Sequence, residues 1–153
     1  VMENMSLKET GLVLQFHVVA MFLPSLITGN LIKKYGHSRI IYGGVLFFFI
    51  TVLLSLFEQT YLNYMLSLIF LGLGWNFLFI SGTSLVVLTY NKEEKFKVQG
   101  INDLIVFSTM ALASLSAGIL LNSIGWKMMN IICIPFLILI ILVSFVADKK
   151  SAS

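Results

Sequence analysis

Residues 10–32 read TGLVLQFHVVAMFLPSLITGNLI, and no charged residue lies between Glu9 and Lys33. As a helix rising about 1.5 Å per residue, this run is long enough to cross a hydrocarbon core of about 30 Å. Its hydrophobic residues do not alternate with polar ones, and the run is too long for a barrel strand. A helix is the remaining way to span a bilayer, so the run predicts an integral membrane protein.

The rest of the chain repeats this pattern. Charge-poor runs predict four more transmembrane helices, over about 40–57, 61–90, 98–122 and 128–147. Of the 153 residues, 58% are hydrophobic and only 11% are charged, whereas soluble domains carry roughly 25% charged residues. The predicted fold class is an all-α membrane protein with five transmembrane helices, and residues 1–153 form a single transmembrane domain.

The basic residues are divided unevenly between the two sides of this topology. Eight lie on one side, namely Lys33, Lys34, Arg39, Lys92, Lys95, Lys97, Lys149 and Lys150. Lys8 and Lys127 lie on the other side. Because lysine and arginine are enriched in cytoplasmic loops, this pattern predicts a multi-pass protein of the cell (plasma or inner) membrane, with its N-terminus outside and its C-terminus in the cytoplasm. The expected partner is therefore the lipid bilayer. Basic residues scattered in this way form no phosphate-tracking stripe, which argues against nucleic acid.

Two prolines lie inside predicted helices, Pro24 in the first and Pro135 in the last. Each removes one backbone hydrogen bond, so we expect a kink at both positions.

Asp103 is the one acid inside a predicted span, and Asn102 precedes it. A carboxylate in a bilayer is costly unless it faces protein or water, so it needs a partner. Three roles stay open: pairing at a cytoplasmic gate, proton coupling, or an acid near a helix N-terminus that the helix dipole stabilises.

Candidate solute-binding residues occur in two predicted helices, Gln15 and His17 in the first and Trp75 and Asn76 in the third. An intramembrane histidine can titrate, bind a solute or hydrogen-bond to a neighbouring helix. Trp75 and Asn76 lie far from the interfacial belt where an anchoring tryptophan belongs, so they suit either a solute cavity or packing between helices.

Enzyme motifs are missing from the sequence. There is no HExxH, GxSxG, Walker loop or CxxC, and a membrane aspartyl protease needs a second intramembrane acid besides Asp103. The single cysteine, Cys133, excludes a disulfide within the chain and a cysteine-based zinc site. The sequence therefore predicts a protein that is not an enzyme and has no cofactor and no bound metal.

The segment 29–39 reads GNLIKKYGHSR and resembles the loop signature G-x-x-x-D-(R/K)-x-G-R-(R/K) of the major facilitator superfamily. The matching positions are Gly29, Lys34 and Gly36. Lys33 replaces the acid, and His37 and Ser38 replace basic residues. Three more stretches are similar to one bacterial branch of that superfamily, namely HVVAMFLPS at 17–25, GLGWNF at 72–77 and QGIND at 99–103.

The resemblance implies helices 8–12 of a twelve-helix transporter, that is, an incomplete C-terminal six-helix half bundle. Its partner would be the missing N-terminal half of the same protein. The solute-binding residues that it implies are Gln15, His17, Trp75 and Asn76, because helices 8 and 10 line or flank the cavity. Asn102 and Asp103 would lie at the contact between the halves, and gating would also involve Gly29, Lys34, Gly36 and Arg39.

The predicted function is a secondary active transporter that moves a small-molecule solute across the cell membrane by alternating access, here as a C-terminal fragment. The alternative is a non-transporting membrane assembly or regulatory subunit of five helices. The helix predicted at 98–122 favours that alternative, because small residues at four-residue spacing let helices approach closely. These residues are Ala113 with Ala117 and Ser114 with Gly118.

Overall fold

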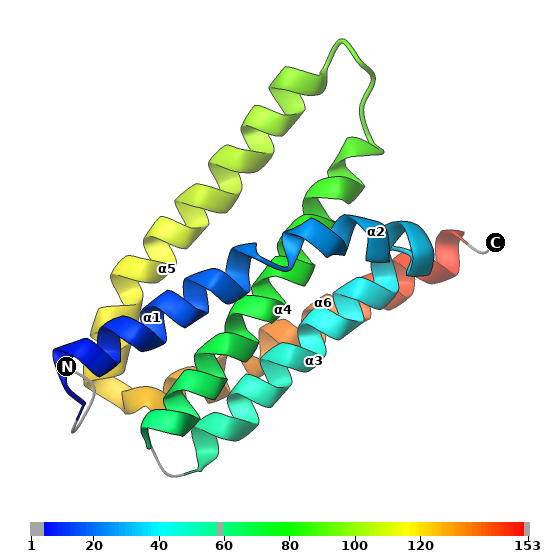
Figure 1. Ribbon diagram of the computed structural model, residues 1–153. Helices are drawn as coiled ribbons and strands as arrows, with labels where there is room; N and C mark the ends of the chain where they lie inside the picture. The colour runs from blue at the N-terminus through cyan, green and yellow to red at the C-terminus, as the bar shows by residue number, and fades with distance from the viewer. Residues whose placement is uncertain (1–4, 58–59, 152–153) are drawn as a thin grey trace.

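A computed structural model describes residues 5–57 and 60–151, and all of its regular structure is helical (Figure 1). The helices are α1 (Leu7–Phe22), α2 (Ser25–Tyr35), α3 (His37–Leu56), α4 (Tyr61–Val87), α5 (Lys95–Ile132) and α6 (Ile134–Ser151). The all-helical fold class is confirmed for the described part of the chain.

The helix predicted at 10–32 is two helices in the structure. Ser6 and Glu9 form a capping box that starts α1: Glu9 N donates to Ser6 Oγ at 3.2 Å, and Ser6 N donates to Glu9 Oε2 at 2.8 Å. The chain then breaks at Leu23 and Pro24, and α2 follows. The break lies at the proline where a kink is expected, because Pro24 has no N–H to continue the ladder.

The segment 29–39, expected to be a loop, is helical on both sides of one residue. Gly29 and Lys34 lie inside α2, and Arg39 lies in the first turn of α3. Gly36 alone separates the two helices, with φ 85° and ψ 160°. Only glycine adopts this region without strain, and this explains how the chain reverses within one residue.

α4 lies at the centre of the bundle, with α1 on one side and α3 on the other (Figure 1). Glycines on α4 let its backbone lie close to both α1 and α3. A Cβ on Gly72 would lie 2.7 Å from His17 O of α1, and a Cβ on Gly74 would lie 2.9 Å from Gly44 O of α3. The α4 backbone therefore rests almost directly on its two neighbours.

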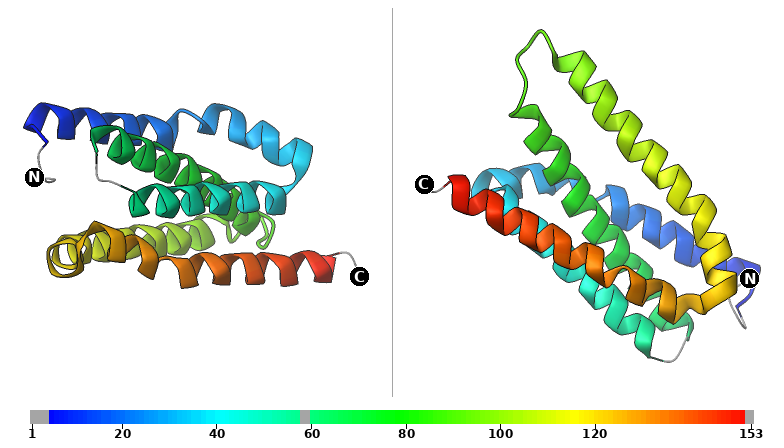
Figure 2. Two further views of the ribbon diagram at one scale, coloured as in Figure 1. Left: turned by 90° about the horizontal axis from the view of Figure 1, so that it is seen from below. Right: turned by 180° about the vertical axis from the view of Figure 1, so that it is seen from behind.

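α5 and α6 form the other layer, and Figure 2 shows α6 crossing the outside of α3 and α4. Gly125 interrupts α5 with φ 76° and ψ 171°, and the chain turns back there. A second break at Cys133 precedes Pro135, which lies in the first turn of α6. The expected kink near Pro135 is thus a break between two helices.

Four segments of the described chain are long and apolar enough to cross a membrane: Leu7–Tyr35, His37–Leu56, Tyr61–Val87 and Lys95–Lys149. The last contains 55 residues and includes the reversal at Gly125. The sequence-based count of five treats it as two crossings.

Candidate functional site

The break at Pro24 leaves backbone carbonyls without their usual helical donors. The first backbone hydrogen bonds after the break run from Leu26 N to Leu23 O at 3.3 Å and from Ile27 N to Pro24 O at 2.9 Å. The carbonyls of the preceding turn instead accept from side chains. Ser25 Oγ donates to Phe22 O at 2.6 Å.

The Met21 carbonyl takes its donor from another helix. Asn76 Nδ2 on α4 donates to Met21 O at 2.7 Å. Thr28 Oγ1 on α2 donates to Asn76 Oδ1 at 2.7 Å and also lies 2.8 Å from Pro24 O. We call Met21, Pro24, Thr28 and Asn76 the Pro24 junction. It ties both sides of the kink to the central helix.

The two side chains that hydrogen-bond to each other in the Pro24 junction are buried. Thr28 is 0% exposed and Asn76 is 1% exposed. Buried amides are costly without partners, and here both ends of the Asn76 amide are hydrogen-bonded. In this conformation the Asn76 side chain is bonded to protein groups and is closed to a solute.

His17 lies one turn before Met21, at the crossing of α1 and α4. Its Nδ1 is 2.7 Å from Leu68 O, and the side chain is half-buried. A carbonyl oxygen only accepts, so Nδ1 carries the proton in this contact. Nε2 is then the nitrogen left for another group. The crossing is close enough for this bond because Gly72, four residues after Leu68, has no side chain.

Trp75 forms an aromatic surface beside the Pro24 junction. Its ring stacks on Phe79, with centroids 4.6 Å apart and planes 11° apart. Phe22 meets Trp75 edge to face, with centroids 6.1 Å apart, and is 59% exposed. Gln15, two turns before Phe22, is also exposed on α1. The structure therefore brings Phe22, Trp75 and Phe79 together as a partly open aromatic surface.

The residues expected at the gate fall into two groups. Lys34, Gly36 and Arg39 lie where α2 meets α3, and Gly29 lies about two turns earlier in α2. Figure 1 shows this junction at one end of the bundle. Asn102 and Asp103 lie on α5, which does not contact α2 within the described residues. The hydrogen bond that Asp103 accepts comes from its neighbour, with Asn102 Nδ2 3.2 Å from Asp103 Oδ1.

Asp103 lies further inside its helix than the sequence suggests. α5 begins at Lys95, so Asp103 lies about 12 Å from the first residue at 1.5 Å per residue. The dipole effect falls off within the first turn, so it contributes little at this carboxylate.

Asp148 is a polar contact that sequence reasoning missed. It accepts hydrogen bonds from Ser38 Oγ and, at 3.1 Å, from Tyr42 Oη, which joins the end of α6 to the first turns of α3. The sequence contains a sign of this contact, because the hydroxyl residues Ser38 and Tyr42 are four residues apart and so lie on one face of a helix. Asp148 itself is followed by Lys149 and Lys150, a charged run that is typical of the end of a transmembrane helix.

Within the described residues, no group of three or more histidine, cysteine, aspartate and glutamate side chains could hold a metal ion.

The family model for the Major Facilitator Superfamily matches residues 1–153.

The chain belongs to the major facilitator superfamily. Its relatives in this superfamily include the riboflavin transporter RfnT of Brucella anthropi, which is 39% identical over 136 residues. That alignment covers 89% of this chain and 34% of RfnT. The MFS-type transporter YdeG of Bacillus subtilis, which is uncharacterized, is 30% identical over 128 residues, covering 82% of this chain and 30% of YdeG.

The chain thus spans about a third of the length of these superfamily relatives. No solved structure matches it. The sequence-based identification of the superfamily is confirmed, and with it a multi-pass membrane protein related to transporters.

Proposed function

We propose that the complete protein is a secondary active transporter of a small solute that works by alternating access, and that this chain is its last five transmembrane helices. The observation that carries the proposal is the superfamily match over the whole chain, together with a relative that is a transporter by name. The transport cycle would rock this half against an N-terminal half around a central solute site.

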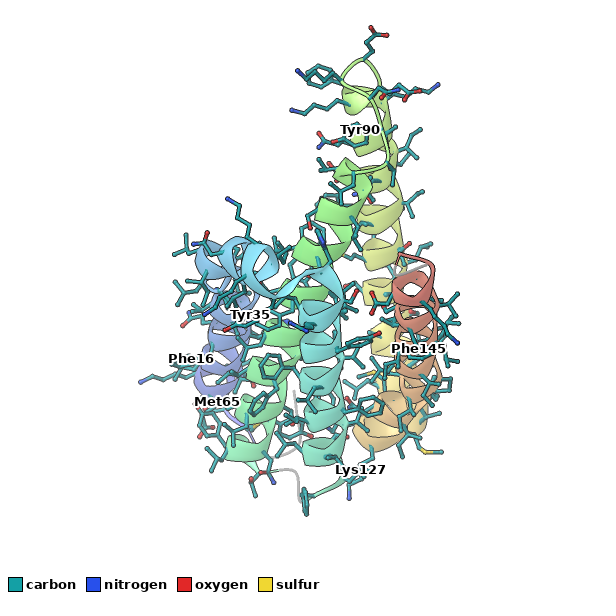
Figure 3. The ribbon with its side chains drawn as sticks, turned by 90° about the vertical axis from the view of Figure 1, so that its right-hand side faces the viewer. Phe16, Tyr35, Met65, Tyr90, Lys127 and Phe145 are labelled. Atoms are coloured by element: carbon teal, nitrogen blue, oxygen red, sulfur yellow. The ribbon has the colours of Figure 1, made fainter. Side chains whose placement is uncertain are left out.

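Five crossings follow if the segment Lys95–Lys149 crosses twice, with its turn at Gly125. Figure 3 supports this, because Tyr90 before α5 and Lys127 after the turn lie at opposite ends of the molecule. With the loop before α5 in the cytoplasm, as the basic residues favour, Lys127 is outside and the C-terminus is inside.

For the solute, we propose a planar aromatic molecule of the riboflavin type. RfnT supports this class, and so does the partly open surface of Phe22, Trp75 and Phe79. Flat rings gain roughly 0.5–1.5 kcal/mol from stacking beyond the area they bury. Polar groups nearby on α1 would orient the ring system. We assign this role to Gln15 and to Nε2 of His17.

Asn76 takes part through the Pro24 junction. Its bonds to Met21 and Thr28 hold the α1 kink that places Phe22 against Trp75. We propose that these bonds rearrange when the cavity opens, and that the Asn76 amide then becomes available to the solute.

The test is uptake of riboflavin, followed by its fluorescence, into vesicles that contain the full-length protein. We expect uptake that Trp75→Ala reduces about tenfold and Trp75→Phe largely keeps, because loss of a stacking partner costs on the order of 1–3 kcal/mol. Trp126→Phe is the matched control, since Trp126 packs edge to face against Tyr64, far along α4 from Trp75.

Two outcomes test the solute class and the transport mechanism separately. Transport of another solute but not of riboflavin would overturn the solute class and keep the transporter. Transport that persists after proton and sodium gradients are both collapsed would overturn the secondary active mechanism.

A further inference from the structure

A groove opens on the outer side of the bundle, away from the Pro24 junction. Its volume is about 380 Å³, within the range of ligand pockets. It lies between Ile41 on α3, Leu78 and Gly82 on α4, and Leu139, Val143 and Ser144 on α6. Figure 2 shows α6, the outer wall, lying across α3 and α4.

The groove is apolar almost throughout. Ser144 contributes the one hydroxyl side chain of its lining, and no charged group is present. Solute sites place several polar groups to orient their ligand, and this groove has no such set. Leu139 is 56% exposed and Val143 is 61% exposed, so the wall is open to the surroundings. The acyl chain of a membrane lipid matches this apolar lining.

One end of the groove is charged. Ile41 lies one turn after Ser38 on α3, and Ser144 lies one turn before Asp148 on α6. Because Ser38 donates a hydrogen bond to Asp148, the groove ends about one helical turn from that contact.

Basic side chains flank this end. Arg39 follows Ser38 and Lys149 follows Asp148, and both are exposed. Asp148 accepts from two hydroxyls, those of Ser38 and Tyr42, so its carboxylate is already hydrogen-bonded. Lys33 and Lys34 at the end of α2 add further positive charge at the same end of the bundle.

We propose that this groove binds one anionic phospholipid, with an acyl chain between α3, α4 and α6 and the phosphate at Arg39 and Lys149. The proposal rests on the membrane-spanning family and is independent of the transported solute. Basic pockets between transmembrane helices bind anionic headgroups through the same charge complementarity.

The experiment measures lipid retained by the full-length protein. The protein is purified in detergent micelles that contain equal amounts of phosphatidylglycerol and phosphatidylcholine, and bound lipids are counted by native mass spectrometry. We expect one tightly held phosphatidylglycerol. The double change Arg39→Gln with Lys149→Gln should lower its retention about tenfold, because each basic residue near the headgroup adds to the attraction. Lys92→Gln with Lys95→Gln is the matched charge control and should retain the lipid, because Lys92 lies just before α5 and Lys95 is the first residue of α5.

A second pair of variants tests the groove itself. Gly82 lines the groove and has open space where a Cβ would lie, so Gly82→Leu should fill it and displace the lipid. Gly118→Leu on α5, also in open space, is the control. Gel filtration shows whether each variant keeps its fold. If Gly82→Leu does not fold, the double variant Arg39→Gln with Lys149→Gln still tests the proposal.

Equal retention of the two lipids by the unmodified protein would overturn the anionic preference. Retention unchanged in both the charge variant and a folded Gly82→Leu variant would place the lipid elsewhere. No retained lipid at all would overturn the proposal.

Discussion

Gly36 and Gly125 have nearly the same backbone conformation, with φ 85° and ψ 160° in one and φ 76° and ψ 171° in the other. A side chain in this region costs on the order of 1–3 kcal/mol. We therefore expect Gly36→Ala to lower the thermal unfolding temperature of the full-length protein. Gly29→Ala is the control, because Gly29 is helical with nothing within 4 Å of a Cβ. Equal melting of the two variants would contradict the assigned strain.

Asn76 is the residue on which the Pro24 junction depends. Asn76→Ala removes the donor to Met21 O and the acceptor for Thr28, and a buried group left unsatisfied costs about 1–3 kcal/mol. A double-mutant cycle with Thr28→Val, measured by chemical unfolding in detergent, should show coupling between the two side chains. Strict additivity would show that the hydrogen bond between them contributes nothing.

Ser81 offers a contrast on the same helix. It is 0% exposed, and its Oγ has no hydrogen-bond partner among the described residues. Removing an unpaired buried hydroxyl relieves a desolvation cost, so Ser81→Ala should leave the unfolding temperature unchanged or raise it. A clear decrease would reveal a bonding partner for this hydroxyl in the complete protein.

At the scale of helices, the crossing of α1 and α4 depends on Gly72. A Cβ there would lie 2.7 Å from His17 O and 2.9 Å from Ala20 Cβ, so the helices must separate. We expect Gly72→Ala to destabilise the protein by about 1–3 kcal/mol, the usual cost of overpacking. Gly82→Ala on the same helix meets nothing within 4 Å and should have no such effect in the same unfolding experiment.

The sequence predicted an all-helical chain because charge gaps and hydrocarbon thickness depend only on local composition. It predicted a kink at Pro24 for the same local reason, and the structure has a break between two helices there. It could not predict that Asn76 would donate to the freed Met21 carbonyl, because the donor lies 55 residues away along the chain. The contact of Asp148 with Ser38 could not be predicted for the same reason, because the two residues are 110 positions apart along the chain.

The segment after Gly29 shows another limit of sequence reasoning. Its charges and glycines are typical of a loop, yet α2 continues through Lys34 to Tyr35. One glycine with positive φ is enough to reverse the chain, so the remaining residues of the segment stay helical. Composition indicates that a turn is present but not how few residues it needs.

At the scale of the whole molecule, α5 stands apart from α2 with its Asp103 exposed. In the two-half architecture that we propose, we expect the partner of this carboxylate to lie in the N-terminal half. Asp103→Asn should then change the balance between inward-open and outward-open states more than solute affinity. Labelling of cysteines introduced singly on each side of the membrane, in a Cys133→Ser background, measures that balance. A loss of affinity with unchanged labelling would argue for direct solute binding instead.

The single-residue reversal at Gly36 also bears on how the protein is made. Because Gly36 is the one residue between α2 and α3, no loop separates the two helices. One helix therefore cannot insert into the bilayer while the other stays outside it. We expect the two to enter the membrane during synthesis as one hairpin, and the bend at Gly125 places the same condition on the chain beyond it. We therefore expect these segments to be inserted as pairs of helices, each pair joined at a glycine.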